Sequence, residues 1–388
     1  MHIWVITEHW PPRVGGIERY LTGIAKYLAK NGHTVTVFAP TPSNSLFVRG
    51  RERRRIPLLT KEGLGEVSIV RHRFFYPLIP KWLPLYIFLL LQAFRKKPDV
   101  IIAGKALFEG RLASWLKKTL HIPYIVCTYG MEIATWQLEQ KTSNQLVGVL
   151  AGATHILAIN QQTKQELITL GAHAKQITII YPGIEPANFD QMNNPDDVLK
   201  KYAITQPYIL SVARLVRRKG IDDLIEAVAQ LRIARQDGGP ALVLVGDGPE
   251  RKNLENLAAQ SHVPAIFLGT IPDADVHALY SRAKLFALTP KELPGDYEGF
   301  GIVYLEAGFF GLPVIATRTG GVPEAVIDNE TGILAEPGNS ASIAHALTTL
   351  LDNPELATHY GEAGKQRVLK QFQWSALISS LEHILATL

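Results

Sequence analysis

The pattern that most constrains this fold is an alternation of apolar strands and amphipathic helices, which occurs twice along the 388-residue chain. In the first series, residues 3–7 and 33–39 have strand character, and residues 17–30 between them carry apolar side chains at helical spacing. Further strands are predicted at 100–103, 124–128 and 155–159. This alternation predicts a doubly wound, mostly parallel α/β sheet.

A second series begins after a break rich in turn-forming residues at 181–186 and 193–196. Its predicted elements are strands at 208–212, 241–245, 265–268, 285–288 and 313–316, and helices at 221–234 and 250–260. A chain of this length exceeds one ordinary domain. We therefore predict two Rossmann-like domains that meet near residue 190.

The predicted N-terminal domain covers 1–190, with an amphipathic C-terminal helix at 374–388 that packs back onto it, and the second domain covers 191–373. Open α/β sheets bind ligands outside the carboxyl ends of their strands. With two such sheets facing each other, the expected site is the cleft between them.

Composition excludes several classes of protein. With 47% hydrophobic and 19% charged residues the chain is globular. A single cysteine, Cys127, excludes an internal disulfide and a cysteine-based zinc site, and its apolar surroundings predict a buried strand position. Residues 1–6 have strand character and lack the features of a secretory signal, so we expect a cytoplasmic location.

Positive charge is concentrated at the start of the chain. Residues 1–97 hold 16 basic and 5 acidic residues, and basic clusters at 49–55 and 71–73 precede an aromatic and apolar stretch that extends to residue 91. That stretch is too short and too interrupted by proline to span a bilayer. We expect either a peripheral anionic membrane surface at 49–55 and 71–91, or a solvated basic loop beside a buried helix. No nucleic-acid-binding module accompanies the charge, so nucleic acid is not an expected partner.

Two acids stand eight residues apart around a Gly-Phe-Gly turn that is predicted to start a helix, Glu298 and Glu306. The start of a helix attracts phosphate through unpaired N–H groups and the helix dipole. Helical rise limits this spacing to about 12 Å, close to the length of an extended nucleotide-sugar. Either the acids hold the two ends of such a ligand, or Glu298 is a helix cap and Glu306 an exposed helix residue.

Two cations follow the first strand of the second domain, Arg214 and Lys219. An arginine binds two phosphate oxygens at once and a lysine adds a compact charge, so this pair can neutralise a diphosphate leaving group. Between them, Arg217 and Arg218 are predicted to be solvated surface charges.

Glycine turns follow several predicted strands, at Gly15-Gly16, Gly246-Asp-Gly248 and Gly320-Gly321. Each is predicted either to admit a ligand closely or to serve as a tight turn alone. The first is not a G-x-G-x-x-G fingerprint, which argues against a standard NAD site.

Tyr129 follows a strand of the first domain and is predicted either to bind a sugar hydroxyl or to pack. No histidine pair has metal-ligand spacing and no Asp-x-Asp motif suggests a metal-bound diphosphate, so neither a metal nor a cofactor is expected.

Taken together, these features resemble family 4 of the retaining, nucleotide-sugar-dependent glycosyltransferases of GT-B fold. The motifs that carry the resemblance occur in order over nearly the whole chain: 12–19, 31–37, 213–220, 246–249, 298–306 and 320–324. The context of 294–306 is most similar to the branch that contains bacterial phosphatidylinositol and mannosyl-lipid mannosyltransferases. That branch implies a donor such as GDP-mannose, whereas the residues themselves leave mannose or glucose, the base and the acceptor open.

The resemblance also implies roles for single residues. Glu298 would contact the donor sugar, and Glu306 the ribose. The diphosphate would face Arg214, Lys219, Gly16 and the N–H groups of Phe300, Gly301 and Ile302, while Gly246 and Gly320 would border the donor. Tyr129 stands where the family often has a histidine, and tyrosine cannot become a cation near neutral pH.

The implied reaction is transfer of a hexose to an acceptor hydroxyl, on a lipid or a growing glycan, with retention by front-face attack. The departing diphosphate would accept the acceptor proton, since only Glu298 lies near the sugar. Two alternatives are a nucleotide-sugar epimerase of GT-B fold, which needs no acceptor, and a noncatalytic nucleotide-sugar-binding protein, which releases no nucleotide.

Overall fold

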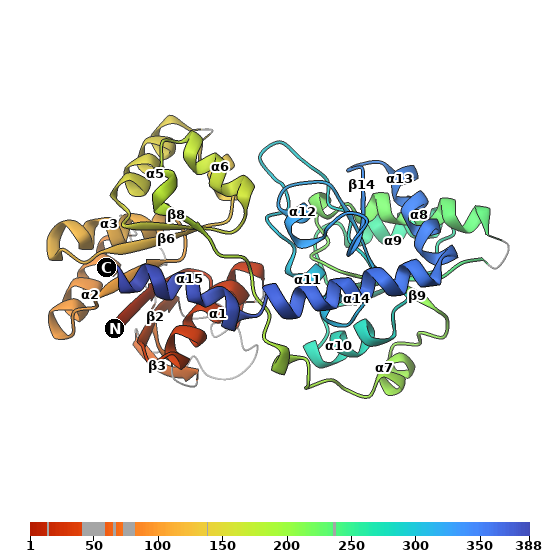
Figure 1. The fold of residues 1–388 in the computed structure, drawn as a ribbon, viewed down its shortest axis with the longest axis horizontal. Helices are drawn as coiled ribbons and strands as arrows, with labels where there is room; N and C mark the ends of the chain where they lie inside the picture. The colour runs from red at the N-terminus through yellow and green to blue at the C-terminus, as the bar shows by residue number, and fades with distance from the viewer. Residues whose placement is uncertain (14, 41–58, 65–66, 73–81, 138, 236–237) are drawn as a thin grey trace, which may run out of the picture. The chain divides into compact units, whose positions relative to one another are not determined.

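The computed structural model describes residues 1–388 apart from 14, 41–58, 65–66, 73–81, 138 and 236–237 (Figure 1). The chain divides into two compact units. The N-terminal unit comprises Met1–Gly183 and Trp374–Leu388, and the C-terminal unit comprises Ile184–Gln373. The predicted division lies near residue 190. In the structure Ile184 N already donates a hydrogen bond to Phe372 O (2.8 Å), which joins residue 184 to the C-terminal unit.

The N-terminal unit is built on an eight-stranded sheet in the order β3-β4-β2-β1-β5-β6-β7-β8. Neighbouring strands are parallel except β3 and β4, which pair antiparallel at one edge. The strands are β1 (His2–Ile6), β2 (Thr34–Pro40), β3 (Leu59–Leu64), β4 (Val67–His72), β5 (Val100–Ala103), β6 (Tyr124–Thr128), β7 (His155–Ala158) and β8 (Ile177–Ile179). The predicted strands are confirmed, whereas β3, β4 and β8 were not predicted.

Helices connect these strands. They are α1 (Gly16–Lys30), α2 (Trp82–Arg95), α3 (Phe108–Leu120), α4 (Met131–Gln137), α5 (Gln140–Gly152), α6 (Gln161–Thr169) and the C-terminal α15 (Trp374–Ala386), with a short 3-10 turn η2 (Ala174–Gln176). Helix α15 packs on α1, where the Trp374 ring occupies the space that a side chain at Gly23 would need.

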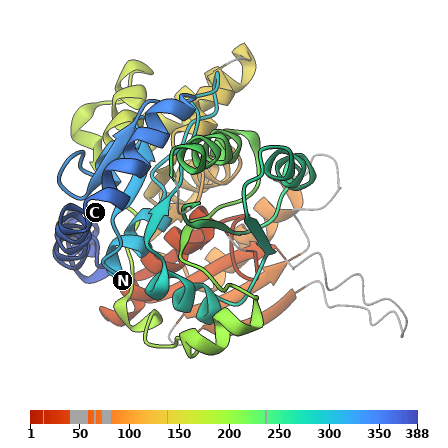
Figure 2. The same ribbon diagram turned by 90° about the vertical axis from the view of Figure 1, so that its right-hand side faces the viewer.

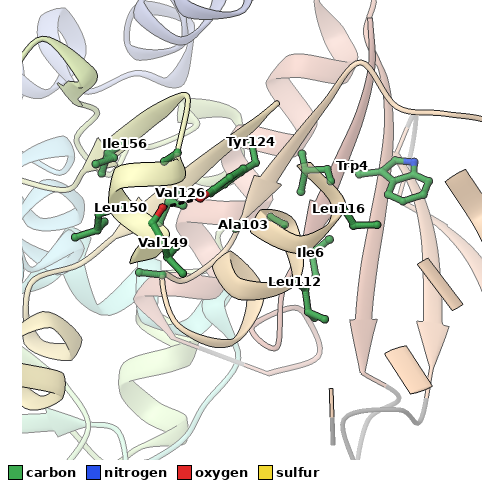
Figure 3. Packing of buried hydrophobic residues seen from close by; sticks show 14 of the residues in the cluster. Trp4, Ile6, Ala103, Leu112, Leu116, Tyr124, Val126, Val149, Leu150 and Ile156 are labelled. Carbon is green, nitrogen blue, oxygen red and sulfur yellow. Dashed lines mark hydrogen bonds between the residues drawn. The ribbon is translucent and has the colours of Figure 1, made fainter. Parts of the chain in front are cut away.

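The core of the N-terminal unit lies between the sheet and its helices (Figure 3). Strand residues such as Ile6 and Val126 are fully buried against Leu112 and Leu116 of α3. Tyr124 reaches across this layer and donates a hydrogen bond to Val149 O (2.6 Å), drawn as a dashed line in Figure 3. Buried apolar side chains on the strands stabilise the parallel arrangement, which requires cover on both faces. Cys127 is buried in β6, as predicted.

The C-terminal unit has a six-stranded sheet, parallel throughout, in the order β11-β10-β9-β12-β13-β14. The strands are β9 (Tyr208–Val212), β10 (Ala241–Val245), β11 (Ala265–Gly269), β12 (Leu285–Ala287), β13 (Val314–Thr317) and β14 (Gly332–Ala335). The two predicted Rossmann-like sheets are thus confirmed, and only β14 was not predicted in this unit.

The helical elements of the C-terminal unit are η3 (Pro186–Asn188), α7 (Pro195–Lys201), η4 (Arg217–Lys219), α8 (Ile221–Ala234), α9 (Arg251–Gln260), α10 (Asp273–Arg282), α11 (Ile302–Phe309), α12 (Val322–Ala325), α13 (Ser340–Asp352) and α14 (Pro354–Gln371). Helices α8 and α9 lie side by side, and Figure 2 shows them nearly end-on. Asparagine side chains cap α7, α13 and α14 by accepting from first-turn N–H groups, which fixes where these helices begin.

Candidate functional site

Most of the predicted site residues of the C-terminal unit lie on loops at the carboxyl ends of strands. In the sheet order, β10 and β11 lie on one side of β9, and β12 to β14 on the other. The order therefore reverses between β9 and β12, which is the position where open α/β sheets bind their ligands. The loops after these two strands, 213–220 and 288–301, carry most of the predicted residues.

A carboxylate held by two cations occupies this position. Lys219 Nζ donates to Glu298 Oε2 at 2.5 Å, and Arg218 Nη1 donates to the same oxygen at 2.6 Å. Arg218 also reaches Asp296, with Nε 2.7 Å from Oδ1. The side chains of Arg218, Lys219 and Glu298 are only 16%, 13% and 10% exposed.

Both cations bind one oxygen of Glu298 and leave the other oxygen available. Among the described residues, none donates a hydrogen bond to Oε1. Lys219 likewise has Glu298 as its single hydrogen-bond partner within the described part of the chain, so its ammonium keeps donors to spare. The pair can accept and donate hydrogen bonds to a ligand at the same time.

The charges of the cluster support one another. Burial opposes ionisation of Glu298, but Lys219 and Arg218 outweigh it and hold the pKa of this carboxyl below its ordinary value. Burial lowers the pKa of Lys219, an effect that Glu298 resists and Arg218 reinforces. The acid that was predicted to face a sugar is therefore a carboxylate near neutral pH.

The two loops are also joined through their backbones. Lys291 N donates to Arg218 O (2.7 Å), and Thr289 Oγ1 donates to Gly220 O (3.0 Å). Lys291 Nζ forms ion pairs with Asp222 (2.7 Å) and Asp223 (2.9 Å) in the first turn of α8. These contacts hold the cationic loop, residues 213–220, against the acidic loop, residues 288–301, and none of them uses the Arg218 side chain.

Arg214 has a different environment. Its side chain is exposed and makes no hydrogen bond or ion pair to any residue that the structure describes. The backbone beneath it is held by the turn after β10, because Leu215 N donates to Asp247 O (3.0 Å). A side chain at Gly246 or Gly248 would overlap the carbonyl of Ala213 or Leu215. These glycines thus have a packing role in placing Arg214, and the predicted contact of Gly246 with a donor stays a prediction.

Helix α11 begins between the two acids. Gly301 is its N-cap with φ 81°, and the ring of Tyr304 fills the space that a Cβ at Gly301 would occupy. The N–H groups of Gly301 and Ile302 find no acceptor among the described residues, as expected for the start of a helix. The Phe300 side chain is buried against Phe372. Glu298 is not the cap of this helix, so the alternative prediction that Glu298 serves as a helix cap is wrong.

Glu306 lies inside α11 and is buried, with 6% of its surface exposed. Tyr280, fully buried on α10, donates its hydroxyl to Glu306 Oε2 at 3.1 Å. The alternative of an exposed helix glutamate is therefore wrong. A buried carboxylate oriented by a tyrosine suits recognition of paired hydroxyls such as those of a ribose.

Gly320 packs directly against the backbone of Glu298. It has φ 55°, and a Cβ there would overlap the Glu298 carbonyl oxygen. That same oxygen accepts a hydrogen bond from Gly321 N at 3.0 Å. The turn after β13 thus fixes the position of Glu298, a role that was not predicted for this glycine pair.

Two predicted residues lie in the N-terminal unit. Gly16 begins α1, and among the described residues no atom beyond its chain neighbours and its own helix backbone lies within 4 Å of where its Cβ would be, so a ligand can approach its backbone. Tyr129 follows β6 and is buried, with its ring edge-on to Tyr20 at 5.7 Å between centroids. The packing alternative for the Tyr129 ring is thus observed, and its sugar contact stays a prediction.

Two contributors to the site were not predicted, and one residue was misplaced. Arg218 was predicted to be a solvated charge, and that prediction is wrong because it pairs with Glu298 and Asp296; Arg217 is exposed, as predicted. Asp296 and Tyr280 were not singled out. The position of Asp296 two residues before Glu298 could have indicated its role. Tyr280 is distant in sequence from Glu306, and no sequence pattern indicated their contact.

Part of the basic segment also differs from prediction. Arg71 was assigned to a basic surface, but it lies in β4, is 5% exposed, and donates to Pro11 O (2.5 Å) and Pro40 O (3.4 Å). Residues 49–55 and 73–81 lie outside the described part of the chain.

Two family models match the chain. The model described as "Glycosyltransferase Family 4" matches residues 14–188, and the one described as "Glycosyl transferases group 1" matches residues 196–367. The boundary between them coincides with the turn-rich segment that separates the two series of strands and helices.

Similar proteins agree with both matches. The chain is 27% identical, over 99% of its length and 97% of the relative, to the GDP-mannose-dependent alpha-(1-6)-phosphatidylinositol monomannoside mannosyltransferase of Mycobacterium tuberculosis. Among solved structures, sucrose-phosphate synthase from Thermosynechococcus elongatus superposes with a TM-score of 0.82 at 22% identity, covering 99% of this chain and 98% of that one. HepE of Anabaena in complex with UDP-glucose gives 0.78 at 21% identity, covering both chains fully.

Proposed function

Because the chain belongs to the family 4 glycosyltransferases of GT-B fold, we propose that it transfers a hexose from a nucleoside diphosphate sugar to an acceptor hydroxyl with retention of the α configuration. The observation that carries this proposal is the cluster of Glu298, Lys219 and Arg218 at the switch point of the C-terminal sheet. It combines a carboxylate, spare cationic donors and an adjacent helix start in one place.

We assign the following contacts to the donor. The open oxygen of Glu298 accepts hydrogen bonds from sugar hydroxyls, and Glu306, oriented by Tyr280, accepts from the ribose. Lys219 and Arg214 neutralise the diphosphate, which also receives the free N–H groups at Gly301 and Ile302. Gly16 and Tyr129 of the N-terminal unit are assigned to the same donor by resemblance alone.

The proposed chemistry follows from what the acids are engaged in. A double displacement needs a carboxylate nucleophile and a second acid or base near the sugar. Glu298 is shared by two cations, and Glu306 is placed for the ribose. The acceptor oxygen therefore attacks the anomeric carbon on the face from which the diphosphate leaves, and its proton passes to that departing phosphate oxygen. Lys219 and Arg214 stabilise the charge that grows on the diphosphate, so no metal is required.

The similar proteins suggest which donors and acceptors to propose for this chain. The mycobacterial relative uses GDP-mannose and a phosphatidylinositol mannoside by its name, and HepE was crystallised with UDP-glucose. We propose a mannose- or glucose-type donor and an acceptor on a lipid or a growing glycan. The enzyme would meet such a lipid at the cytoplasmic face of a membrane.

The test is to incubate the protein with GDP-mannose, UDP-glucose or ADP-glucose and a mannoside or lipid-linked acceptor, and to record the anomeric signals by NMR. The proposal predicts an α-linked product with release of the nucleoside diphosphate. A β-linked product would contradict retention. Conversion of the donor to its epimer, or donor binding without any nucleotide release, would replace the proposal by one of the two alternatives.

A surface of α2 supports the membrane part of this proposal. Four large apolar side chains with 38–74% exposure follow one another along the helix: Leu83, Ile87, Leu91 and Phe94. Their spacing of three or four residues places them on one face, opposite the buried Leu85 and Leu89. The helix contains no acid, and exposed Arg95, Lys96 and Lys97 follow that face. An apolar stripe beside cations suits an anionic lipid surface.

Among the described residues no helix has the length and apolar character needed to cross a bilayer, so the proposed contact is peripheral. Co-sedimentation with phosphatidylglycerol vesicles tests it. We expect the double variant Leu91→Ser, Phe94→Ser to lose binding. As a control, Ile233→Ser removes an 88% exposed apolar side chain of α8 and leaves binding unchanged. Equal binding by both variants would contradict the role of α2.

A further inference from the structure

Arg218 belongs to the cluster of Glu298, Lys219 and Arg218, but the proposed function assigns it no contact with the donor. Its guanidinium joins two acids of the 288–301 loop, with Nη1 2.6 Å from Glu298 Oε2 and Nε 2.7 Å from Asp296 Oδ1. The neighbouring Arg217 is exposed, and its side chain has no hydrogen-bond or ion-pair partner among the described residues. Arg218 is therefore distinguished from its neighbour by geometry, although the two are identical in type.

The two cations that contact Glu298 have different roles in the proposed donor complex. Lys219 is assigned to the diphosphate, and a phosphate oxygen that draws its ammonium weakens the 2.5 Å contact with Glu298. A carboxylate with 10% exposure that loses its partner carries a large desolvation cost. Arg218 can hold Glu298 at that stage, because its Nη1 donates to Glu298 Oε2 and its Nε also forms an ion pair with Asp296.

We propose that Arg218 is a positioning residue that keeps the Glu298 carboxylate aligned with the donor sugar while Lys219 engages the diphosphate. This inference rests on the proposed function, which makes Glu298 the sugar contact. It adds a division of labour within the cluster: Lys219 serves the leaving group, and Arg218 serves the group that holds the sugar.

Loss of the Arg218 side chain is expected to leave the loops in place. Their connection also depends on Lys291 N to Arg218 O, on Thr289 to Gly220, and on the Lys291 ion pairs, none of which uses the guanidinium. A defect in Arg218 variants would thus report on Glu298 and not on unfolding of the loop.

The pH dependence gives a readout that a structural role would not change. The charged and titratable groups around Glu298 are Arg218 and Lys219 on the cationic loop, Asp296 on its own loop and the Tyr304 phenol on α11. With Arg218 removed, burial acts against fewer cations, so the carboxylate takes up a proton at higher pH. The acid limb of kcat/KM then moves to higher pH.

The experiment compares Arg218→Gln and Arg218→Lys with Arg217→Gln as the matched control, using GDP-mannose and UDP-glucose as donors. We expect Arg218→Gln to lose about 10- to 100-fold in kcat/KM, the range for a misplaced contact group. Affinity for the free nucleoside diphosphate stays within about twofold, because Arg218 serves the sugar end. Arg218→Lys restores part of the activity and of the pH profile.

Three results would overturn the inference. One is an Arg218→Gln enzyme as active as Arg217→Gln. Another is a loss of nucleoside diphosphate affinity in Arg218→Gln that is as large as its loss of kcat/KM, which would make Arg218 a diphosphate ligand. The third is an unshifted acid limb. A wild-type protein that turns over no donor would instead refute the proposed function, and the inference with it.

Discussion

Replacing Gly320 by alanine tests whether the backbone of Glu298 must stay where the structure places it. The substitution puts a Cβ at a residue with φ 55°, against the Glu298 carbonyl oxygen. Real Cβ atoms keep at least 3.0 Å from such an atom, so the Glu298 backbone must shift by about 1 Å. A shift of this size at a contact group lowers turnover by about 100-fold.

Gly338→Ala is the matched control. Gly338 has φ 71° in the turn between β14 and α13, and in the described part of the chain no atom other than those of its sequence neighbours lies within 4 Å of the position of its Cβ. Both variants carry the cost of an alanine at positive φ, about 1–2 kcal/mol. Only Gly320→Ala displaces Glu298.

Turnover of the donor and the urea midpoint are measured for both proteins. We expect comparable loss of stability from positive φ, with an additional loss in Gly320→Ala, and a loss of turnover in Gly320→Ala alone. If both variants turn over donor at the wild-type rate, the position of the Glu298 backbone is not critical for turnover. A matching loss of turnover in Gly338→Ala would show that instability, not displacement, is responsible.

Three further outcomes are expected. Lys219→Ala and Arg214→Ala each reduce turnover by about 100-fold or more in steady-state assays, as for lost donors to a developing anion, and near-normal turnover in both would remove the diphosphate assignment. Tyr280→Phe, which deletes the hydroxyl on Glu306, weakens nucleoside diphosphate binding by about 3- to 10-fold in calorimetry, and unchanged affinity would mean that Tyr280 does not orient Glu306. Burial, and then Glu8, raises the pKa of Glu109 to about 8, so the folded chain holds a proton that the unfolded chain releases above about 4.5. The free energy of unfolding of the N-terminal unit then falls between about pH 4.5 and pH 8, by at most about 5 kcal/mol, and Glu109→Gln flattens this slope in urea titrations; a slope equal to that of the wild type would place the pH dependence elsewhere.

The fold was largely predictable because its signal is local. Apolar runs such as 208–212 and 241–245 must be buried on both faces, which predicts parallel strands and covering helices. The strands that escaped prediction lie at or near sheet edges, and β3 carries the polar sequence Leu59–Leu64. Edge strands need no apolar run, so periodicity does not reveal them.

The candidate site was predictable only where residue type and chain position agree. Lys219 and Glu298 follow strands that are neighbours in the sheet, so their proximity follows from topology. The difference between Arg217 and Arg218 does not, because adjacent residues of one type are separated only by the direction each side chain takes in the η4 turn. Tyr280 was hidden for a related reason: its contact with Glu306 joins two helices whose packing no sequence pattern describes.

In the proposed donor complex, Glu298 and Glu306 hold opposite ends of a nucleotide-sugar. Calorimetric affinities of the intact donor and of the free nucleoside diphosphate, measured for Glu298→Gln and Glu306→Gln, test this arrangement most directly. If these assignments hold, Glu306→Gln weakens the affinity for both ligands by the same factor, whereas Glu298→Gln weakens the affinity for the intact donor and leaves that for the nucleoside diphosphate unchanged. Equal weakening of the nucleoside diphosphate by Glu298→Gln would contradict them.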